Sequence, residues 1–293
     1  MKPALFKYHD PDSLDEALAL IGTLDEARVL AGGQSLMPMM NFRFVQPDHL
    51  IDLNRIAELS GIAIENGAIR IRAMTRQRDI EFSAEVARHC PILQAALLHV
   101  GHRQTRNRGT LGGSLCHLDP SAELVNCISV HDGARIEVRS RRGRRDLALT
   151  EFAAGFMTHS LAPDEIVTGV TLPLWGADHG YAFAECARRK GDFAVTAVAA
   201  LIALDRGGRI ARAAISVGGV TACPVRQAAA EQLLVGQEPD AEAWRAAAAS
   251  LAFNNPLSDA YITAEYRLHL AEVLVRRALA AAADKAKQRR ADA

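Results

Sequence analysis

The sequence predicts an α+β protein of two domains, and three observations support that prediction. Segments with strand-like alternation and segments with helical periodicity follow one another in irregular order, whereas a doubly wound parallel sheet requires regular alternation. Pro173 and the segment WGADHG follow an alternating strand and mark a domain boundary at about 174–180. The 293 residues are enough for two domains that each have their own core.

The first predicted element is a helix in the segment SLDEALALIG. Ser13 can cap its start, and Glu16 follows three residues later, as in a capping box. Ala17, Leu18 and Ile21 then form an apolar stripe at helical spacing.

The rest of the first domain is predicted to mix strands with one long helix. The segments ARVLAGG, HLIDL and GAIRIRA indicate strands, and Asn66–Gly67 indicates a hairpin turn before the third of them. SAEVARHCPILQAALLHVG is helical in pattern. ARIEVRSRRGRRDLAL predicts a hairpin that turns near Gly143, and DEIVTGVTLPL predicts an alternating strand.

The second domain is predicted to contain two strands followed by alanine-rich helices. VTAVAALIAL and ARAAISVGGV are joined by the turn DRGGRI. The helices are expected in PVRQAAAEQLLVG, DAEAWRAAAASLA and AEYRLHLAEVLVRRALAAAA, and the tail DKAKQRRADA is expected to be frayed. The predicted bounds are therefore 1–176, 177–283 and a tail at 284–293.

Composition excludes several classes of partner. The 34 Lys and Arg residues balance the 34 Asp and Glu residues, so net charge gives no reason to expect a nucleic acid or an anionic membrane. No apolar run reaches the length of a membrane span. The start MKPALFKYHDPDSL lacks the apolar centre of a secretory signal, and we therefore expect a cytoplasmic protein.

The five cysteines are odd in number and widely spaced, with no Cys-x-x-Cys. This pattern argues against a zinc site or an iron–sulfur cluster held by this chain. We expect buried free thiols and no metal site.

Two glycine pairs form the candidate functional motif. AGGQS and TLGGS each follow a predicted strand or loop and place a hydroxyl residue close after the glycines. Glycine permits positive φ, so successive N–H groups can point into one concavity that binds an anion, and two such nests could hold a diphosphate. A plain turn remains an alternative for each pair. A third pair, Gly218–Gly219, has no hydroxyl directly after it and is interpreted as structural. Neither the Rossmann nor the P-loop fingerprint is present.

Six segments resemble one family in the order in which they occur. AGGQSLMPMMNFR and RNRGTLGGSLCHLDPSAE resemble the two signature segments of the FAD-binding medium subunit of molybdenum hydroxylases, the carbon monoxide dehydrogenase and xanthine dehydrogenase family. LAPDEIVTGVTLP, ARRKGDFAV, SVGGVTACPVR and SDAYITAEYRLHLAEVLVRRAL extend the resemblance over nearly the whole chain. It implies a PCMH-type FAD-binding domain of two subdomains, followed by a smaller α+β domain with a short antiparallel sheet and helices.

The resemblance also implies a set of residues that bind FAD. They are Ala31, Gly32, Gly33, Gln34, Ser35, Leu36, Gly101, Thr110, Gly112, Gly113, Ser114, Asp119, Glu123, Ile166, Val167, Arg188, Lys190, Asp192 and Phe193.

The implied roles differ along that set. Both glycine segments would wrap the diphosphate, and Glu123 or Asp119 would lie near the adenosine. Gly101 would let the backbone approach the flavin, and Ile166 or Val167 would contact its ring.

Simpler interpretations remain open for several of these residues. Asp119 followed by proline is also typical of a turn, the Ile-Val pair is also typical of a strand core, and the ARRKGDFAV segment is also typical of a charged surface turn. Cys116 and His117 could in principle carry a covalent flavin, but the resemblance is to the non-covalent branch. The cluster Arg139–Arg145 could dock a partner or form a solvated hairpin tip.

The implied function is an electron-transfer flavoprotein subunit with no catalytic residue for substrate chemistry. Its partners would be a small subunit with 2Fe-2S clusters and a large subunit with the molybdenum cofactor, in a dimer of heterotrimers. Electrons would pass from the clusters through non-covalent FAD to an external acceptor. A free-standing FAD-dependent oxidase or reductase is the alternative, and a scaffold that has lost FAD is a second. The organic substrate and the acceptor are not encoded in these motifs.

Overall fold

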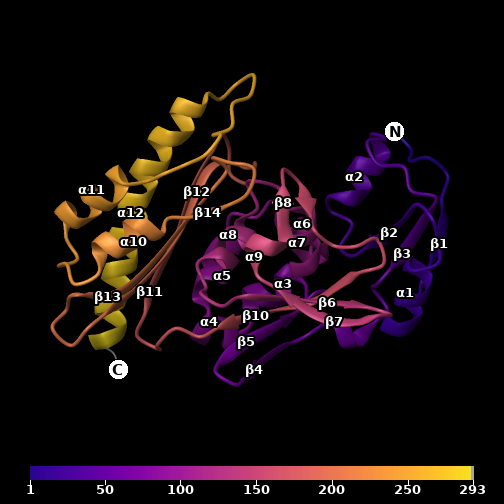
Figure 1. The fold of residues 1–293 in the computed structure, drawn as a ribbon, viewed down its shortest axis with the longest axis horizontal. Helices are drawn as coiled ribbons and strands as arrows, with labels where there is room; N and C mark the ends of the chain where they lie inside the picture. The colour runs from indigo at the N-terminus through magenta and orange to yellow at the C-terminus, as the bar shows by residue number, and fades with distance from the viewer. Residues whose placement is uncertain (292–293) are drawn as a thin grey trace.

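The computed structural model describes residues 1–291, which form three parts in chain order (Figure 1). A small sheet carries the N-terminus on the right of the view, a five-stranded sheet with a layer of helices lies in the middle, and a four-stranded sheet covered by the last helices lies on the left. This is the α+β arrangement predicted from the sequence, with two subdomains followed by a C-terminal domain that has a short antiparallel sheet.

The N-terminal subdomain is a three-stranded parallel sheet in the order β1-β3-β2. Its elements are β1 (Lys7–His9), α1 (Leu14–Ile21), β2 (Ala27–Leu30), α2 (Leu36–Asn41), β3 (His49–Asp52) and the 3₁₀ helix η1 (Ala57–Leu59). The predicted cap of α1 is confirmed, because Ser13 Oγ accepts from Glu16 N at 3.2 Å. The apolar stripe of α1 is buried and consists of Leu14, Ala17, Leu18 and Ile21.

The second subdomain contains an antiparallel sheet in the order β4-β5-β10-β6-β7. Its strands are β4 (Ile62–Glu65), β5 (Ala68–Arg72), β6 (Arg135–Ser140), β7 (Gly143–Leu147) and β10 (Ile166–Pro173), with a separate small hairpin of β8 (Ala153–Gly155) and β9 (Thr158–His159). Both predicted hairpins are confirmed. Asn66 and Gly67 turn the first with φ of 50° and 74°, and Gly143 turns the second with φ of 140°.

Short helices cover the upper face of this sheet in Figure 1. They are α3 (Gln77–Phe82), α4 (Ala84–His89), α5 (Pro91–Leu97), α6 (Arg103–Arg108), α7 (Leu111–His117), α8 (Glu123–Ser129) and α9 (Leu149–Phe152). The single helix predicted between Ser83 and Gly101 is divided into α4 and α5 at Cys90 and Pro91. Proline disfavours helical backbone in the residue before it, and Cys90 has φ −143° and ψ 54°.

The C-terminal domain is an antiparallel sheet in the order β11-β12-β13-β14. Its elements are β11 (Gly180–Ala187), β12 (Ala194–Leu204), β13 (Ile210–Gly218), β14 (Val225–Arg226), α10 (Ala228–Leu234), α11 (Ala241–Ala249) and α12 (Ala264–Ala291). Strand β12 is buried on both faces. Its residues Val198 and Ala200 belong to the core beneath α12, whereas Ala199 and Leu201 belong to the core of the second subdomain. The two domains therefore share one continuous apolar layer.

The tail expected to be frayed from residue 284 is helical as far as Ala291, so that expectation is wrong over most of its length. Ala286 is fully buried against the sheet, and Lys285 Nζ lies 4.0 Å from the ring centroid of Tyr181. Arg290 Nη1 donates to the carbonyl oxygen of Asp205 at 2.6 Å. These contacts order the last turns. Residues 292 and 293 lie outside the described residues.

No helix within residues 1–291 is both long enough and apolar enough to cross a membrane.

The close packing of α12 on β11 gives a test of the fold. A Cβ at Gly180 would overlap the carbonyl oxygen of Ala282 in α12. We expect Gly180→Ala to destabilise the protein by about 1–3 kcal/mol through overpacking. Thermal unfolding followed by circular dichroism would measure the effect. Gly155→Ala is the matched control, because no atom lies within 4 Å of the added Cβ there. Equal melting temperatures for both variants would contradict this packing.

Candidate functional site

The two glycine segments, far apart in the sequence, lie against each other in the structure. The first follows β2, and the second leads into α7. A Cβ on Gly32 would overlap the carbonyl oxygen of Arg108. A Cβ on Gly113 would lie 3.6 Å from the Cβ of Ala31. The two segments predicted to act together are therefore in contact, and the absence of side chains on their glycines allows that contact.

Asn54 and Arg76, which the sequence analysis did not single out, fasten the two segments together. Asn54 Nδ2 donates to the carbonyl oxygen of Ala31 at 2.9 Å, and Arg76 Nη1 donates to that of Arg108 at 2.6 Å. Arg76 also donates to Asn54 Oδ1. Burial, together with the neighbouring charge of Arg108, lowers the pKa of Arg76. Neither residue belongs to a recognisable motif, so the sequence held no signal for this role.

The first segment offers backbone donors. The N–H groups of Gly32, Gly33, Gln34 and Ser35 donate to no acceptor among residues 1–291. Gly33 has φ of +72°, as the nest prediction required, and the side chain of Gln34 folds back to the carbonyl oxygen of Gly32 at 3.2 Å. Leu36 then begins α2. Several N–H groups without partners in one short loop fit a phosphate-bearing ligand.

The second segment differs from the prediction. Gly112 and Gly113 do not have positive φ, because they belong to the first turn of α7. Their N–H groups are engaged: Gly112 N donates to the carbonyl oxygen of Ala73 at 2.8 Å, and Gly113 N donates to the capping Thr110 Oγ1 at 3.0 Å.

The second segment requires glycines because there is no room for a side chain at either position. A Cβ on Gly112 would lie 2.7 Å from the Cβ of Ala73, and one on Gly113 would lie 2.8 Å from Thr110 Oγ1. Ser114 is only partly buried beside them. This segment therefore contributes close approach and a capped helix start, and it does not form a second nest.

At the other end of α6, Gly101 meets the loop between β11 and β12. A Cβ on Gly191 would lie 3.1 Å from the carbonyl oxygen of Gly101 and 3.0 Å from the ring of His102. Gly101 itself has φ of +43° and Gly191 has φ of +86°. The structure thus brings together Gly101 and the 188–193 loop, two segments that the resemblance placed beside the flavin.

The side chains of that loop are largely exposed. Phe193 is 73% exposed, and Arg188 lies 4.0 Å from Asp192 and 5.9 Å from the ring centroid of Tyr261. Lys190 is exposed, yet its charge contributes to the lowered pKa of His99, for which burial is the main cause. The loop therefore presents a cation and an aromatic ring at the domain boundary.

Two carboxyl groups, Glu123 at the start of α8 and Glu185 in β11, have raised pKa values. Burial raises the pKa of Glu123 to about 8, and the nearby acids Glu185 and Asp119 add to that shift. Burial raises the pKa of Glu185 to about 7. Glu185 Oε2 is buried without a hydrogen-bond partner among the described residues, and Oε1 lies 3.9 Å from His99 Nδ1. Glu185 was not a predicted site residue, and no spacing in the sequence marks it.

Asp119 forms the turn that was its simpler interpretation. Its Oδ1 accepts from Ser121 N at 2.8 Å, and Ser121 Oγ in turn donates to the carbonyl oxygen of Ala194 at 2.8 Å. The side chains of Ile166 and Val167 are 3% and 4% exposed and belong to two apolar cores. The structure therefore supports the strand-core interpretation of this pair.

Cys116 and His117 have the properties of packed residues. Burial raises the pKa of the Cys116 thiol to about 12 and lowers the pKa of His117. A neutral thiol is a poor nucleophile, which argues against covalent attachment at this position. All five cysteines are free thiols. Within residues 1–291, no group of three His, Cys, Asp or Glu side chains is placed to hold a metal ion.

Comparison with known families matches both domains. Residues 4–175 match the family described as the FAD binding domain in molybdopterin dehydrogenase, and residues 181–282 match the CO dehydrogenase flavoprotein C-terminal domain.

Relatives of known name match over almost their whole length. The chain is 38% identical to the nicotine 6-hydroxylase medium subunit of Paenarthrobacter nicotinovorans, covering 95% of this chain and 98% of that protein. It is 36% identical to the carbon monoxide dehydrogenase medium chain of Hydrogenophaga pseudoflava, covering 96% and 98%.

The fold is also similar to that of solved structures over almost the whole chain. A chain of carbon monoxide dehydrogenase from Hydrogenophaga pseudoflava superposes with a TM-score of 0.92 at 37% identity, covering 97% of this chain and 99% of that one. A chain of quinoline 2-oxidoreductase from Pseudomonas putida 86 superposes with a TM-score of 0.93 at 35% identity, covering 98% and 99%.

The buried carboxyl groups predict a pH dependence of stability. A folded-state pKa above the unfolded value means that the native chain keeps a proton that the unfolded chain releases. Stability therefore falls as pH rises from the unfolded pKa of 4.5 to the folded values of about 7–8, and it levels off above them. We expect the melting temperature of the double variant Glu123→Gln and Glu185→Gln to fall less between pH 5 and pH 8.5 than the melting temperature of the unmodified protein does. The exposed Glu272→Gln is the control. A parallel decline in all three proteins would refute the assignment.

Proposed function

Because this chain belongs to the family of FAD-binding medium subunits of molybdenum hydroxylases, we propose that it is the subunit through which electrons leave such a complex. One observation carries the proposal. The glycine segments meet at Gly32 and Arg108, and the loop from Gly32 to Ser35 holds four N–H groups without acceptors among the described residues.

The residues present fit non-covalent FAD. The donors of the first segment suit a diphosphate, since a charge-assisted hydrogen bond is worth about 1.5–3 kcal/mol. The contact of Gly191 with Gly101 places the 188–193 loop at the far end of α6, where an extended dinucleotide would bring its second half. Burial raises the pKa of the Cys116 thiol and so disfavours its attack on a flavin.

Bound FAD would supply redox chemistry that accepts electrons singly or in pairs. The chain's own residues would bind and orient it. Backbone donors from Gly32 to Ser35 would hold the diphosphate. Burial favours the neutral form of the Glu123 and Glu185 carboxyl groups and so reduces the negative charge that they carry near neutral pH. Lys190, exposed in its loop, would favour an anionic reduced ring through its positive charge.

The partners follow from the same proposal. Relatives of this chain are named as the medium chain, the medium subunit or subunit alpha of dehydrogenases and of a hydroxylase. We therefore assign it a small partner with 2Fe-2S clusters and a large partner with the molybdenum cofactor, assembled as a dimer of heterotrimers. Substrate hydroxylation takes place on the large partner, and electrons leave through this chain to an external acceptor.

A free-standing flavin oxidase would need a substrate cavity with converging polar groups. The C-terminal sheet does not offer one, because its faces are filled by the apolar side chains of two cores. Two surface hollows, one lined by residues of 60–72 and one by residues of α11 and α12, contain no residue of the glycine segments.

We expect Gly33→Val to weaken FAD binding by about tenfold or more, since each lost charge-assisted bond costs about 1.5–3 kcal/mol. Gly113→Val should also weaken binding, but through packing, because its side chain would push the second segment away from Ala31 in the first. Valine at residue 33 must adopt φ of +72°, and at residue 113 its Cβ would lie 2.8 Å from the capping Thr110 Oγ1. The measurement is flavin released by acid from the purified protein.

Two controls accompany these variants. Gly208→Val imposes a similar φ of +85° where no atom lies within 4 Å of the added Cβ, and it should keep its flavin. Ser114→Ala should have a smaller effect than either site variant, because it removes only one hydroxyl group. Full flavin in both Gly33→Val and Gly113→Val would overturn the diphosphate assignment.

We expect the isolated chain to be inert toward the organic substrate of the complex, although an artificial reductant should bleach its flavin. The reason is the proposed division of labour: substrate chemistry belongs to the large partner, and no group of three His, Cys, Asp or Glu side chains in the described chain is placed to hold a metal ion. Anaerobic absorption spectra of the isolated chain and of the complete complex, each mixed with substrate, would test this. Rapid bleaching of the isolated chain would support the free-standing oxidase instead.

A further inference from the structure

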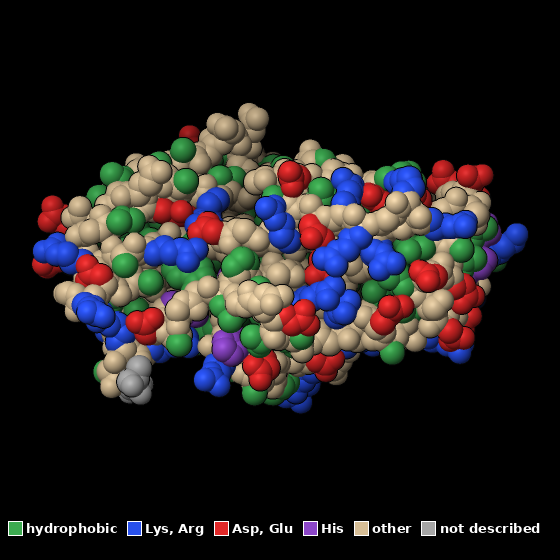
Figure 2. Space-filling model, turned by 60° about the horizontal axis from the view of Figure 1, so that its bottom comes forward, with side chains coloured by type: hydrophobic (Ala, Val, Ile, Leu, Met, Phe, Trp, Pro, Cys, Tyr) green, Lys and Arg blue, Asp and Glu red, His purple; other side chains and the backbone are tan. Residues whose placement is uncertain are grey.

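The outer face of the five-stranded sheet carries a concentration of arginines. Ile69 and Ile71 of β5 are fully buried in the core, so the alternating residues Arg70 and Arg72 point outward. The same alternation along β6 and β7 turns Arg135, Arg139 and Arg144 to this face. We call these five residues the arginine face. In Figure 2, where the underside of the molecule is turned forward, Lys and Arg side chains gather over the middle of the surface.

One arginine of this face is used inside the sheet. Arg70 donates through two nitrogens to the carboxylate of Glu137, which also accepts from Thr171 Oγ1 at 2.9 Å. Gly169 lies between them on β10 and has no side chain to obstruct the pair, since a Cβ there would lie 3.5 Å from Glu137 Oε2. Although burial alone would raise it, the pKa of Glu137 is lowered by these bonds. The carboxylate is 2% exposed and is not available to a partner.

The remaining arginines are not matched in this way. Arg72, Arg135 and Arg139 have no carboxylate within 4 Å among residues 1–291. Arg139 stands directly opposite Arg144 in the β6–β7 pairing, an arrangement of like charges that destabilises a sheet. Arg144 has only the exposed Asp146 at 3.3 Å. Stability of the isolated chain therefore does not explain why these arginines are here.

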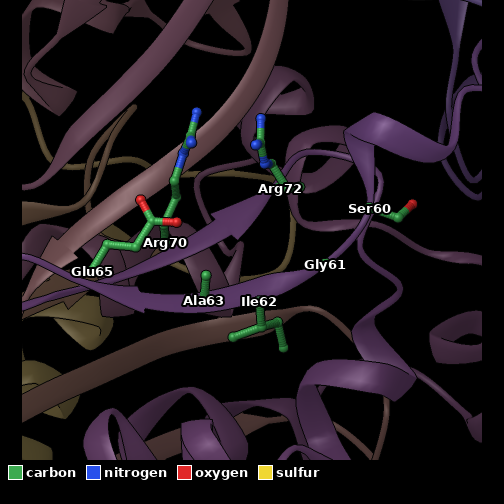
Figure 3. A pocket seen from close by; sticks show the side chains of 7 residues that line it. All are labelled: Ser60, Gly61, Ile62, Ala63, Glu65, Arg70 and Arg72. Carbon is green, nitrogen blue, oxygen red and sulfur yellow. The ribbon is translucent and has the colours of Figure 1, made fainter.

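The Arg139–Arg145 cluster was predicted either to dock a partner or to form a solvated hairpin tip, and its arginines divide between these two roles. Arg142 and Arg145, near the hairpin tip, pair with Asp164 and Glu165 from this chain. Arg139 points to the open face instead. Figure 3 shows the other edge of that face, where Arg70 and Arg72 point to the same side of β5 above a shallow hollow that Ser60 and Ala63 help to line.

We propose that the arginine face docks an acidic protein surface on a partner subunit of the complex. This inference rests on the proposed function, because it assumes that such a subunit exists. Guanidinium groups match carboxylates bidentately and are enriched in protein interfaces. The face carries five arginines and the acids Glu65, Glu137 and Asp146, an excess of two positive charges (5 − 3) on a chain whose formal net charge is zero. Acids interspersed with the arginines suit a patterned protein surface better than a uniform polyanion.

The test is assembly of the complete complex with a charge-reversed face. We expect the triple variant Arg72→Glu, Arg135→Glu and Arg139→Glu to raise the dissociation constant for the partner subunits at least about tenfold at low ionic strength, with a weaker salt dependence than the unmodified chain shows. Co-expression, size-exclusion chromatography and biolayer interferometry over a salt series would measure this. The FAD content should stay at the level of the unmodified chain, because no substitution lies in the glycine segments.

The matched control reverses the same amount of charge elsewhere. Arg245, Arg276 and Arg277 are exposed on α11 and α12 and pair with no carboxylate of the described chain, so Arg245→Glu, Arg276→Glu and Arg277→Glu should assemble normally. If the face triple fails to fold, the Gln triple at 72, 135 and 139 replaces it, with a smaller loss expected. Assembly of the folded face variant with unchanged affinity and salt dependence would overturn the docking surface alone. Failure of the unmodified chain to bind any such subunits would overturn the proposed function.

Discussion

The contact between the backbone of Gly32 and that of Arg108 is the constraint on which the candidate site depends. A side chain at Gly32 would overlap the carbonyl oxygen of Arg108, so the two segments meet only without one. Asn54 donates a hydrogen bond to the first segment at Ala31, Arg76 donates one to the second at Arg108, and the two side chains are hydrogen-bonded to each other. Once the segments are fixed, the N–H groups that follow Gly32 are free to bind an anion, because the close packing leaves them no acceptor within the described chain.

The part of the site where the 188–193 loop meets Gly101 depends on how the two domains share a core. Strand β12 buries alternate side chains in two apolar clusters, one beneath α12 and one within the second subdomain. That double burial fixes where β11 ends and β12 begins, and hence where the 188–193 loop meets Gly101. The same packing removes Glu123 and Glu185 from water, which raises the pKa of both carboxyl groups. Stability and the electrostatic environment of the site are therefore consequences of one interface.

The two faces of the five-stranded sheet carry side chains of different kinds. Its inward residues are apolar and fully buried, as in any sheet that covers a core. Its outward residues include Arg139 and Arg144 directly opposite each other, an arrangement of like charges that costs stability, and Arg139 has no carboxylate of the described chain within 4 Å. The proposed docking of an acidic partner would offset that cost, so the pattern fits a subunit better than a chain that acts alone.

The sequence determined whatever depends on local patterns. The α1 cap at Ser13, the hairpin turns at Asn66–Gly67 and Gly143, the apolar strand β12 and the α+β class were all readable from spacing and turn chemistry, because neighbouring residues decide them. The family, too, was recognisable from ordered segments. Tertiary structure decided the rest. It drew Gly112 and Gly113 into a helix whose N–H groups are already satisfied, ordered the tail through Ala286, and buried Ile166 and Val167 in two cores. It also placed Arg76, Asn54 and Glu185 at the site. Their roles arise from contacts between residues far apart in the chain, and no local pattern records which distant backbone a side chain will meet.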